Sequence, residues 1–201
     1  MIKSSLIRQF GNPRGTLGHV AGRIMATRAS NVERNVWIAK LLDPDPDANL
    51  LEFGHGPGIA IAHIWPQLTT GHIVGLDVSD LMSKSARKRN QDGVDRGVVE
   101  FRTGDAQDLP PDLQDLDVIY GVNVSMFWSD PQATISQLAE RLRPGGAITL
   151  AYMTPPTADR PAQSMGDEIS AHFDATGLVR VTTETFDFDP PAIAVTGHRP
   201  A

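Results

Sequence analysis

Three glycines recur at alternate positions in the stretch LLEFGHGPG, which spans residues 50–58. The apolar residues before them are typical of a buried strand, so the glycines fall in the turn that follows it. Glycine has no Cβ, which lets backbone N–H and C=O groups approach a ligand closely. This pattern predicts a ligand site at the end of a strand.

The spacing of Gly54, Gly56 and Gly58 narrows the choice of ligand. A dinucleotide fingerprint reads G-x-G-x-x-G, whereas here the third glycine comes one position early. Ile59 stands where that fingerprint has glycine or alanine, and its branched side chain would hinder close helix–strand packing. A nicotinamide oxidoreductase is therefore disfavoured, and the chain has no P-loop of the form G-x-x-x-x-G-K-[ST].

Strand-like and helix-like segments alternate along the chain. The expected strands are 48–53, 72–78, 98–103, 116–122, 147–153, 178–187 and 191–198, and the expected helices include 30–42, 58–68, 80–91, 129–146 and 163–176. Such alternation indicates a parallel sheet covered on both faces. The last two strands leave no room for a crossover helix and should pair antiparallel.

We therefore expect an α/β fold: a Rossmann-like, doubly wound sheet of seven strands, mostly parallel with an antiparallel last strand and helices on both faces. Ligands bind such sheets at the carboxyl ends of the strands, which is where the glycine turn falls. The helix of 129–146 should start at Ser129 or Asp130 and stop at Pro144-Gly145-Gly146.

Composition limits the classes of function. The 201 residues carry a net charge of −6, which argues against a general nucleic-acid binder. Cysteine is absent, which excludes disulfides and thiolate metal sites and favours a cytoplasmic protein. No apolar run is long enough for a transmembrane helix, and no carboxylate–histidine spacing suggests a metal site.

Charge is distributed unevenly. Residues 1–40 hold seven Lys or Arg and one acid, a net charge of +6, whereas the remainder holds 11 basic and 23 acidic residues, a net charge of −12. The basic arm either docks on the body of one fold or meets an anionic substrate or lipid surface. We expect a single domain over 1–201, in which 1–42 form a helical arm or lid and 48–201 form the core.

The stretch LLEFGHGPG resembles the first motif of the class I S-adenosylmethionine-dependent methyltransferases, in particular the small, single-domain bacterial members. Four further stretches follow in the order of that family, from about residue 33 to the end: GLDVS, TGDAQDLP, DVIYGVNVSMFWSDP and LRPGG. The resemblance implies an enzyme with S-adenosylmethionine as cofactor and S-adenosylhomocysteine as product.

The resemblance also implies a set of cofactor contacts. The expected cofactor-binding residues are Glu52, Gly54, Gly56, Gly58, Asp77, Val78, Asp105, Ala106 and Asn123. Asp77 would accept hydrogen bonds from the ribose hydroxyls of the cofactor. Asp105 and Ala106 would face its adenine, and Glu52 would shape the site around its amino-acid end. A helix N-terminus after the glycines favours the ligand's carboxylate. Alternatively, Asp77 has no ligand and only caps the helix that begins near Ser79.

Methyl transfer needs mainly proximity and orientation, and a general base only when the nucleophile arrives protonated. The catalytic residues therefore stay unassigned, with His19, His55 and Asn123 as candidates. The substrate should be lined by the loop after the fourth strand, with Tyr120, Met126, Phe127 and Trp128.

The acceptor is expected to be a hydroxyl or amine of a small, partly hydrophobic molecule. No proline–aromatic motif of the nucleic-acid methylating enzymes follows the fourth strand, and cysteine-based pyrimidine methylation is excluded. Two alternatives stay open: a phospholipid N-methyltransferase that contacts membranes through the basic arm, and a protein that binds the cofactor without turnover. The acceptor and the oligomeric state are undetermined.

Overall fold

The computed structural model describes residues 29–153, 162–189 and 191–201. The chain divides into two compact units, Met1–Asp105 and Ala106–Ala201. Most of the expected arm, including the candidate base His19, lies outside the described residues. The division into an arm or lid (1–42) and a core (48–201) within a single domain stays a prediction.

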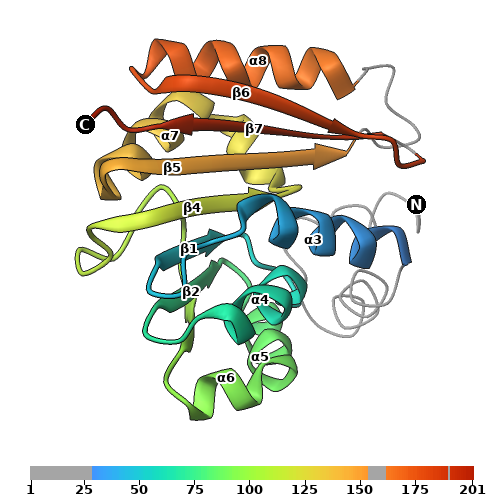
Figure 1. Cartoon of the computed structure of the whole chain (residues 1–201), viewed down its shortest axis with the longest axis vertical. Coiled ribbons are helices and arrows are strands. Elements are labelled where there is room, and N and C mark those ends of the chain that lie inside the picture. Colours follow the sequence, from blue (N-terminus) through green and yellow to red (C-terminus); the bar gives the residue numbers. More distant parts are fainter. Residues whose placement is uncertain (1–28, 154–161, 190) are drawn as a thin grey trace. The chain divides into compact units, whose positions relative to one another are not determined.

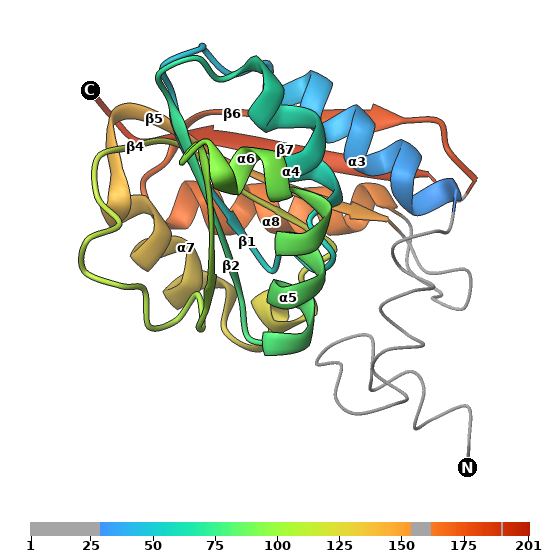
Figure 2. The same cartoon turned by 90° about the horizontal axis from the view of Figure 1, so that it is seen from below.

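The first unit is a parallel three-stranded sheet with helices. Its elements are α3 (Ala29–Leu42), β1 (Asn49–Phe53), α4 (Ile59–Ile64), η1 (Trp65–Gln67), β2 (His72–Asp77), α5 (Asp80–Arg89), α6 (Gln91–Asp95) and β3 (Val99–Thr103). Its strand order is β3-β2-β1. Figure 2 shows α4 and α5 on the same side of β1 and β2. Apolar residues of β1 and β2 are buried on both faces, as in parallel sheets generally.

The second unit contains four strands in the order β4-β5-β7-β6. Its elements are β4 (Leu116–Val122), η2 (Ser125–Ser129), α7 (Pro131–Arg141), β5 (Leu142–Met153), α8 (Ala162–Ala175), β6 (Val179–Phe186) and β7 (Ala192–His198). β4 and β5 are parallel, whereas β7 runs antiparallel to β5 and to β6. Helix α8 lies along β6 and β7 (Figure 1), and Gly197 leaves room there for the buried Phe173 ring.

Seven strands of this pairing confirm the expected Rossmann-like α/β fold, including the antiparallel pairing of the last two strands. The expected end of the helix at 146 is wrong, because α7 stops at Arg141 and β5 begins at Leu142. The segment Pro144-Gly145-Gly146 belongs to β5, where Gly145 N–H donates to Arg199 O at 3.0 Å and Gly146 O accepts from Arg199 N–H at 2.9 Å. These backbone hydrogen bonds with Arg199 place Gly145 and Gly146 in a strand instead of at the end of a helix.

Two other expected helices are each divided. The helix of 58–68 continues beyond α4 only as the 3₁₀ turn η1, which contains Pro66, a residue that disfavours helix interiors. The helix of 80–91 ends at Arg89, and Asn90 separates it from α6. Among the described residues, no helix combines the length and the apolar character that crossing a membrane requires.

Helix α7 begins at an aspartate cap, which offers a test of the fold. Asp130 Oδ1 accepts a hydrogen bond from Ala133 N–H at 3.1 Å, so Asp130, one of the two expected caps, is the residue that caps the helix. We expect Asp130→Ala to lower the free energy of unfolding by about 1 kcal/mol, because an N-terminal N–H loses its partner. Urea denaturation measures this. Asp130→Ser keeps a capping oxygen and should cost less; equal losses in both variants would contradict the capping role.

Candidate functional site

The glycine turn joins β1 to α4. Gly54, Gly56 and Gly58 have φ angles of 65°, 51° and 68°, a left-handed backbone that side chains disfavour. Gly54 N–H donates to Leu76 O at 2.7 Å, which ties the turn to the end of β2. Gly58 N–H donates to His55 O at 3.0 Å, which closes the turn on itself. The turn is thus a fixed structure at the carboxyl end of β1.

Gly56 and Gly58 serve different needs. A Cβ on Gly58 would lie 2.8 Å from the Cβ of Ala86 and 2.9 Å from Nδ2 of Asn90, so this glycine permits close packing on α5. A Cβ on Gly56 would meet no protein atom within 4 Å. The packing of the chain therefore accounts for Gly58, whereas at Gly56 the turn faces open space.

Helix α5 holds the carbonyl side of the turn. Arg89 Nε donates to Pro57 O at 3.0 Å, and Asn90 Nδ2 donates to Gly58 O at 3.0 Å. Asn90 is 1% exposed and also donates to Ala86 O at 2.9 Å. The last turn of α5 is basic, with Arg87, Lys88 and Arg89, and the sequence pattern assigned neither Arg89 nor Asn90 to the turn.

Asp77, the last residue of β2, joins the turn to the start of α5. Its Oδ2 accepts Gly56 N–H and its Oδ1 accepts Ser79 N–H, each at 2.8 Å. Ser79, rather than Asp77, caps α5 by accepting Met82 N–H at 3.4 Å. Asp77 is 8% exposed, and each carboxylate oxygen keeps a further lone pair for a ligand.

The other expected cofactor residues occupy the ends of the strands. Glu52 is buried in β1 two residues before Gly54, and Val78 directly follows β2. Asp105 and Ala106 follow β3 and are half-buried. Their contacts with a cofactor stay predictions.

His55 is buried in the turn, and the contacts of its two ring nitrogens define its tautomer. Its Nδ1 lies 2.8 Å from Gly56 O, and its Nε2 lies 3.5 Å from Ser83 Oγ. A carbonyl can only accept, so Nδ1 carries the proton, and the neutral ring accepts from Ser83 through Nε2. Thr103 donates in turn to Ser83 Oγ at 3.3 Å. Each ring nitrogen of His55 is thus hydrogen-bonded to another residue of the first unit.

The protonation of His55 follows from its burial. Desolvation lowers its pKa below the ordinary value, while the Asp77 carboxylate and the Gly56 carbonyl act in the opposite direction. The edge of the imidazole packs on Phe101, with ring centroids 5.0 Å apart. The buried neutral ring is therefore a packed and hydrogen-bonded part of the turn.

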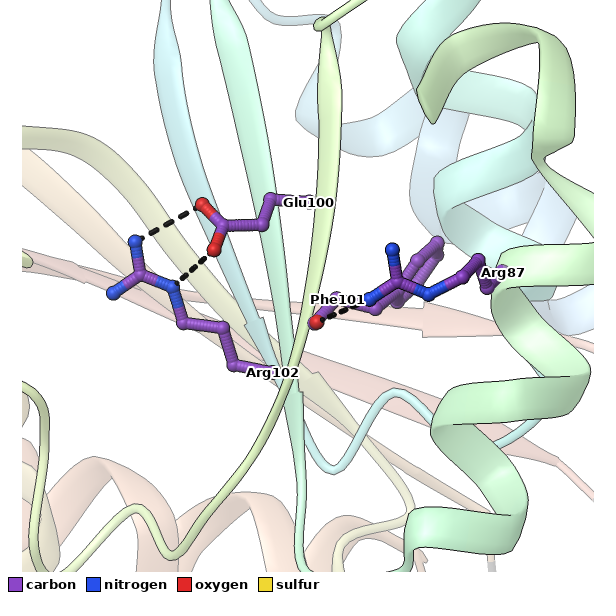
Figure 3. A network of polar contacts seen from close by, with 4 residues as sticks. All are labelled: Arg87, Glu100, Phe101 and Arg102. Carbon is purple, nitrogen blue, oxygen red and sulfur yellow. Dashed lines mark hydrogen bonds and ion pairs between the residues drawn. The ribbon is translucent and has the colours of Figure 1, made fainter. Parts of the chain in front are cut away.

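Phe101 is fixed to α5 by its own backbone. Arg87 Nη2 donates to Phe101 O at 2.9 Å, while Glu100 and Arg102 form an ion pair on the other side of β3 (Figure 3). Arg87 thereby satisfies a carbonyl on β3, the edge strand of this unit's sheet. The ring that supports His55 is held from both the strand and the helix.

Three of the expected substrate residues lie in the loop after β4, whereas Tyr120 lies in β4 itself. Tyr120 and Phe127 are fully buried, and Trp128 is half-buried. Phe127, Trp128 and Tyr152 form a cluster in which Trp128 lies 5.1 Å from each of the other two ring centroids. The side chain of Met126 lies outside the described residues. A role in substrate binding stays a prediction for all four expected residues.

Two bonds from β5 secure this loop. Asn123, with a φ of 53°, accepts Met153 N–H on its Oδ1 at 2.9 Å. The Tyr152 hydroxyl donates to Val124 O at 2.9 Å, and burial raises the pKa of Tyr152 above its ordinary value, which keeps the phenol neutral. The sequence had not singled out Tyr152. Within the described residues, no group of three or more His, Asp or Glu could hold a metal ion.

Comparison with known proteins agrees with this geometry. A family model described as "Methyltransferase domain" matches residues 50–146. The chain is 29% identical to the uncharacterized methyltransferase YdaC of Bacillus subtilis (strain 168), covering 90% of this chain and 99% of that protein. It is 32% identical to an O-methyltransferase of Pyrenophora dematioidea over 55% of this chain, but it spans only 41% of that protein.

A solved structure shares the fold. A SAM-dependent methyltransferase from Aquifex aeolicus superposes with a TM-score of 0.65 at 15% identity, covering 84% of this chain and 89% of that one. The glycine turn and the strand-end aspartate lie on a sheet of that same fold. Residues 50–146 therefore match a methyltransferase domain, and the fold is that of class I S-adenosylmethionine-dependent methyltransferases.

The different surroundings of the two glycines can be separated by mutation. Gly56→Ala should lower the free energy of unfolding by about 1–2 kcal/mol, the cost of a left-handed alanine. Gly58→Ala should cost about 1–3 kcal/mol more, because its Cβ would also overlap Ala86 and Asn90. Chemical denaturation of both variants measures the difference. Equal destabilisation would contradict the packing role of Gly58.

His55 should also contribute to the pH dependence of folding. Its pKa in the folded chain lies below the ordinary 6.5, so the unfolded chain binds the proton more readily. The contribution of neutral His55 to the free energy of unfolding is therefore fully present above about pH 6.5 and decreases as the pH falls below that value. His72, whose pKa burial also lowers, acts in the same direction. The unfolding free energy should decrease from pH 7 to pH 5 with a smaller slope in His55→Asn; an unchanged slope contradicts the assignment.

Proposed function

We propose that this chain uses S-adenosylmethionine to methylate a hydroxyl or amine of a small, partly hydrophobic molecule. The observation that carries the proposal is the open position at Gly56, beside a nearly buried Asp77 whose two oxygens already accept backbone N–H groups. The match to a methyltransferase domain supports the cofactor, and this pair of residues supports its place in the first unit.

The residues present fit such a cofactor. The amino-acid end requires a close approach to backbone atoms, and no protein atom lies within 4 Å of a Cβ on Gly56. A ribose requires a fixed acceptor for two hydroxyls, and the remaining lone pairs of Asp77 meet that requirement. No phosphate is involved, which agrees with a turn that lacks both the P-loop lysine and the dinucleotide spacing.

Each residue then has a defined task. Gly54, Gly56 and Gly58 keep the turn in a shape that admits the amino-acid end, and Asp77 orients the ribose. Glu52 would shape the amino end, and Asp105 with Val78 and Ala106 would border the adenine. When bound, S-adenosylmethionine supplies an electrophilic methyl group on a sulfonium. The chain's contribution to the reaction is to hold that group and the acceptor in line.

The acceptor side is inferred from the loop after β4. Its buried aromatic cluster suits a partly apolar molecule, and the similarity to an O-methyltransferase supports a hydroxyl. His55 has both nitrogens engaged, so it has no lone pair free to remove a proton from an acceptor. We therefore propose an acceptor that loses its proton readily, or one whose proton is removed by a base other than His55.

Calorimetric titration tests the cofactor. We expect binding of S-adenosylmethionine and S-adenosylhomocysteine and none of NADH. Binding of NADH alone would overturn the proposal. A screen of hydroxyl and amine acceptors, monitored by S-adenosylhomocysteine formation, then separates an enzyme from a protein that binds without turnover.

The role of Asp77 is tested by changing protein and ligand together. Asp77→Ala should weaken S-adenosylhomocysteine binding by about 1.5–3 kcal/mol, the usual loss for a hydrogen bond to a charged group. Asp80→Ala is the matched control, because Asp80 is exposed and pairs with Lys84. Wild-type protein should also bind the ligand's 2′,3′-dideoxy analogue weakly, whereas Asp77→Ala should not distinguish the two ligands. If it still distinguishes them, Asp77 does not bind the ribose.

A further inference from the structure

Gly56 is held from both sides by side chains. Its N–H donates to Asp77 Oδ2 at 2.8 Å, and its C=O faces His55 Nδ1 at 2.8 Å. Two peptide units at the centre of the turn are thereby fixed, with Gly56 at a φ of 51°. Asp77 is restrained by the same contact, because its Oδ2 is oriented by the Gly56 N–H.

His55 is itself held by residues of two elements of the first unit, α5 and β3. Ser83 of α5 contacts Nε2, Thr103 at the end of β3 donates to Ser83, and the Phe101 ring of β3 supports the imidazole. The Gly56 carbonyl selects the tautomer, because it can only accept, and the Ser83 hydroxyl then donates to the unprotonated Nε2. His55 is 3% exposed, so this arrangement is shielded from water.

We propose that His55 is a positioning residue for the cofactor: its Nδ1–H fixes the Gly56 carbonyl, so that the turn and Asp77 are preorganised for the ligand. This inference rests on the proposed function, because it takes the turn as the cofactor site. The role requires a donor at the Nδ1 position and does not require a group that gives or takes a proton.

Three lines of geometry favour this role over simple packing. The Nδ1 contact is directed at Gly56, a glycine of the turn whose Cβ position is open. The ring carries a polar relay through Ser83 and Thr103, which an apolar filler of the same volume would not need. The held residue, Gly56, also contacts the proposed ribose ligand Asp77. A ring that served packing alone would need none of these polar contacts.

Two substitutions separate positioning from packing. His55→Phe keeps an aromatic ring against Phe101 and removes the donor to Gly56. His55→Asn places an amide where Nδ1 stood and removes most of the ring. We expect His55→Phe to stay folded and to bind S-adenosylhomocysteine about tenfold more weakly, the effect of one lost hydrogen bond. His55→Asn should lose more thermal stability and yet keep its affinity within about threefold.

The test depends on the two variants ranking in opposite order: His55→Phe should be the more stable variant and the weaker binder. A packing role predicts that affinity follows stability, so that His55→Asn would be the weaker binder, and this result would overturn the proposal. His72→Gln is the control, since His72 lies at the opposite end of β2 from Asp77 and should leave affinity unchanged. Long-range ¹H–¹⁵N NMR of the imidazole should report the Nδ1–H tautomer; an Nε2–H tautomer would also overturn the proposal.

Failure of this inference differs from failure of the proposed function. If wild-type protein does not bind S-adenosylhomocysteine, the cofactor assignment is wrong. If wild-type protein binds it and His55→Phe binds it equally well, the cofactor assignment stands and His55 has no positioning role.

Discussion

The carboxylate of Asp77 is the interaction on which the rest of the first unit's site depends. It lies at the end of β2 and accepts N–H groups from the turn after β1 and from the residue that caps α5. A nearly buried carboxylate is costly unless its oxygens are hydrogen-bonded. The bonds that satisfy Asp77 therefore also fix the spacing between two strand ends and a helix start.

The glycine turn reflects two separate physical demands. Gly58 is required by the protein, because α5 approaches so closely that a Cβ would overlap Ala86. Gly56 has no such neighbour, so packing of the described chain does not account for it, and the proposed function assigns its open side to a ligand. Helix α5 serves both, since Asn90 and Arg89 hold the carbonyl groups of the turn while Ser83 contacts His55. The basic face of this helix is thus partly structural.

The sequence predicted the elements that depend on local patterns and missed those that depend on distant partners. The apolar runs of β1 and β2, the position of Asp77 and the antiparallel closing pair follow from short-range signals. The strand that includes Pro144-Gly145-Gly146 does not, because its pairing partner, Arg199, is far along the chain. His55 could be noted as unusual within the turn, but its partners Ser83 and Thr103 lie 28 and 48 residues away. The spacing of apolar residues in a sequence does not indicate such long-range contacts between side chains.

The same distinction explains why the acceptor is harder to infer than the cofactor. The first unit must present fixed backbone atoms and a carboxylate, and these leave recognisable spacings in the sequence. In the second unit, Asn123 and Tyr152 hold the backbone of the loop after β4 from β5, so the loop's position is set by residues that need not contact a substrate. Because an activated methyl group requires orientation more than acid–base chemistry, the acceptor requires no particular catalytic residue type that a sequence pattern would reveal. The cluster of Phe127, Trp128 and Tyr152 is the part of the second unit from which we infer a partly apolar acceptor.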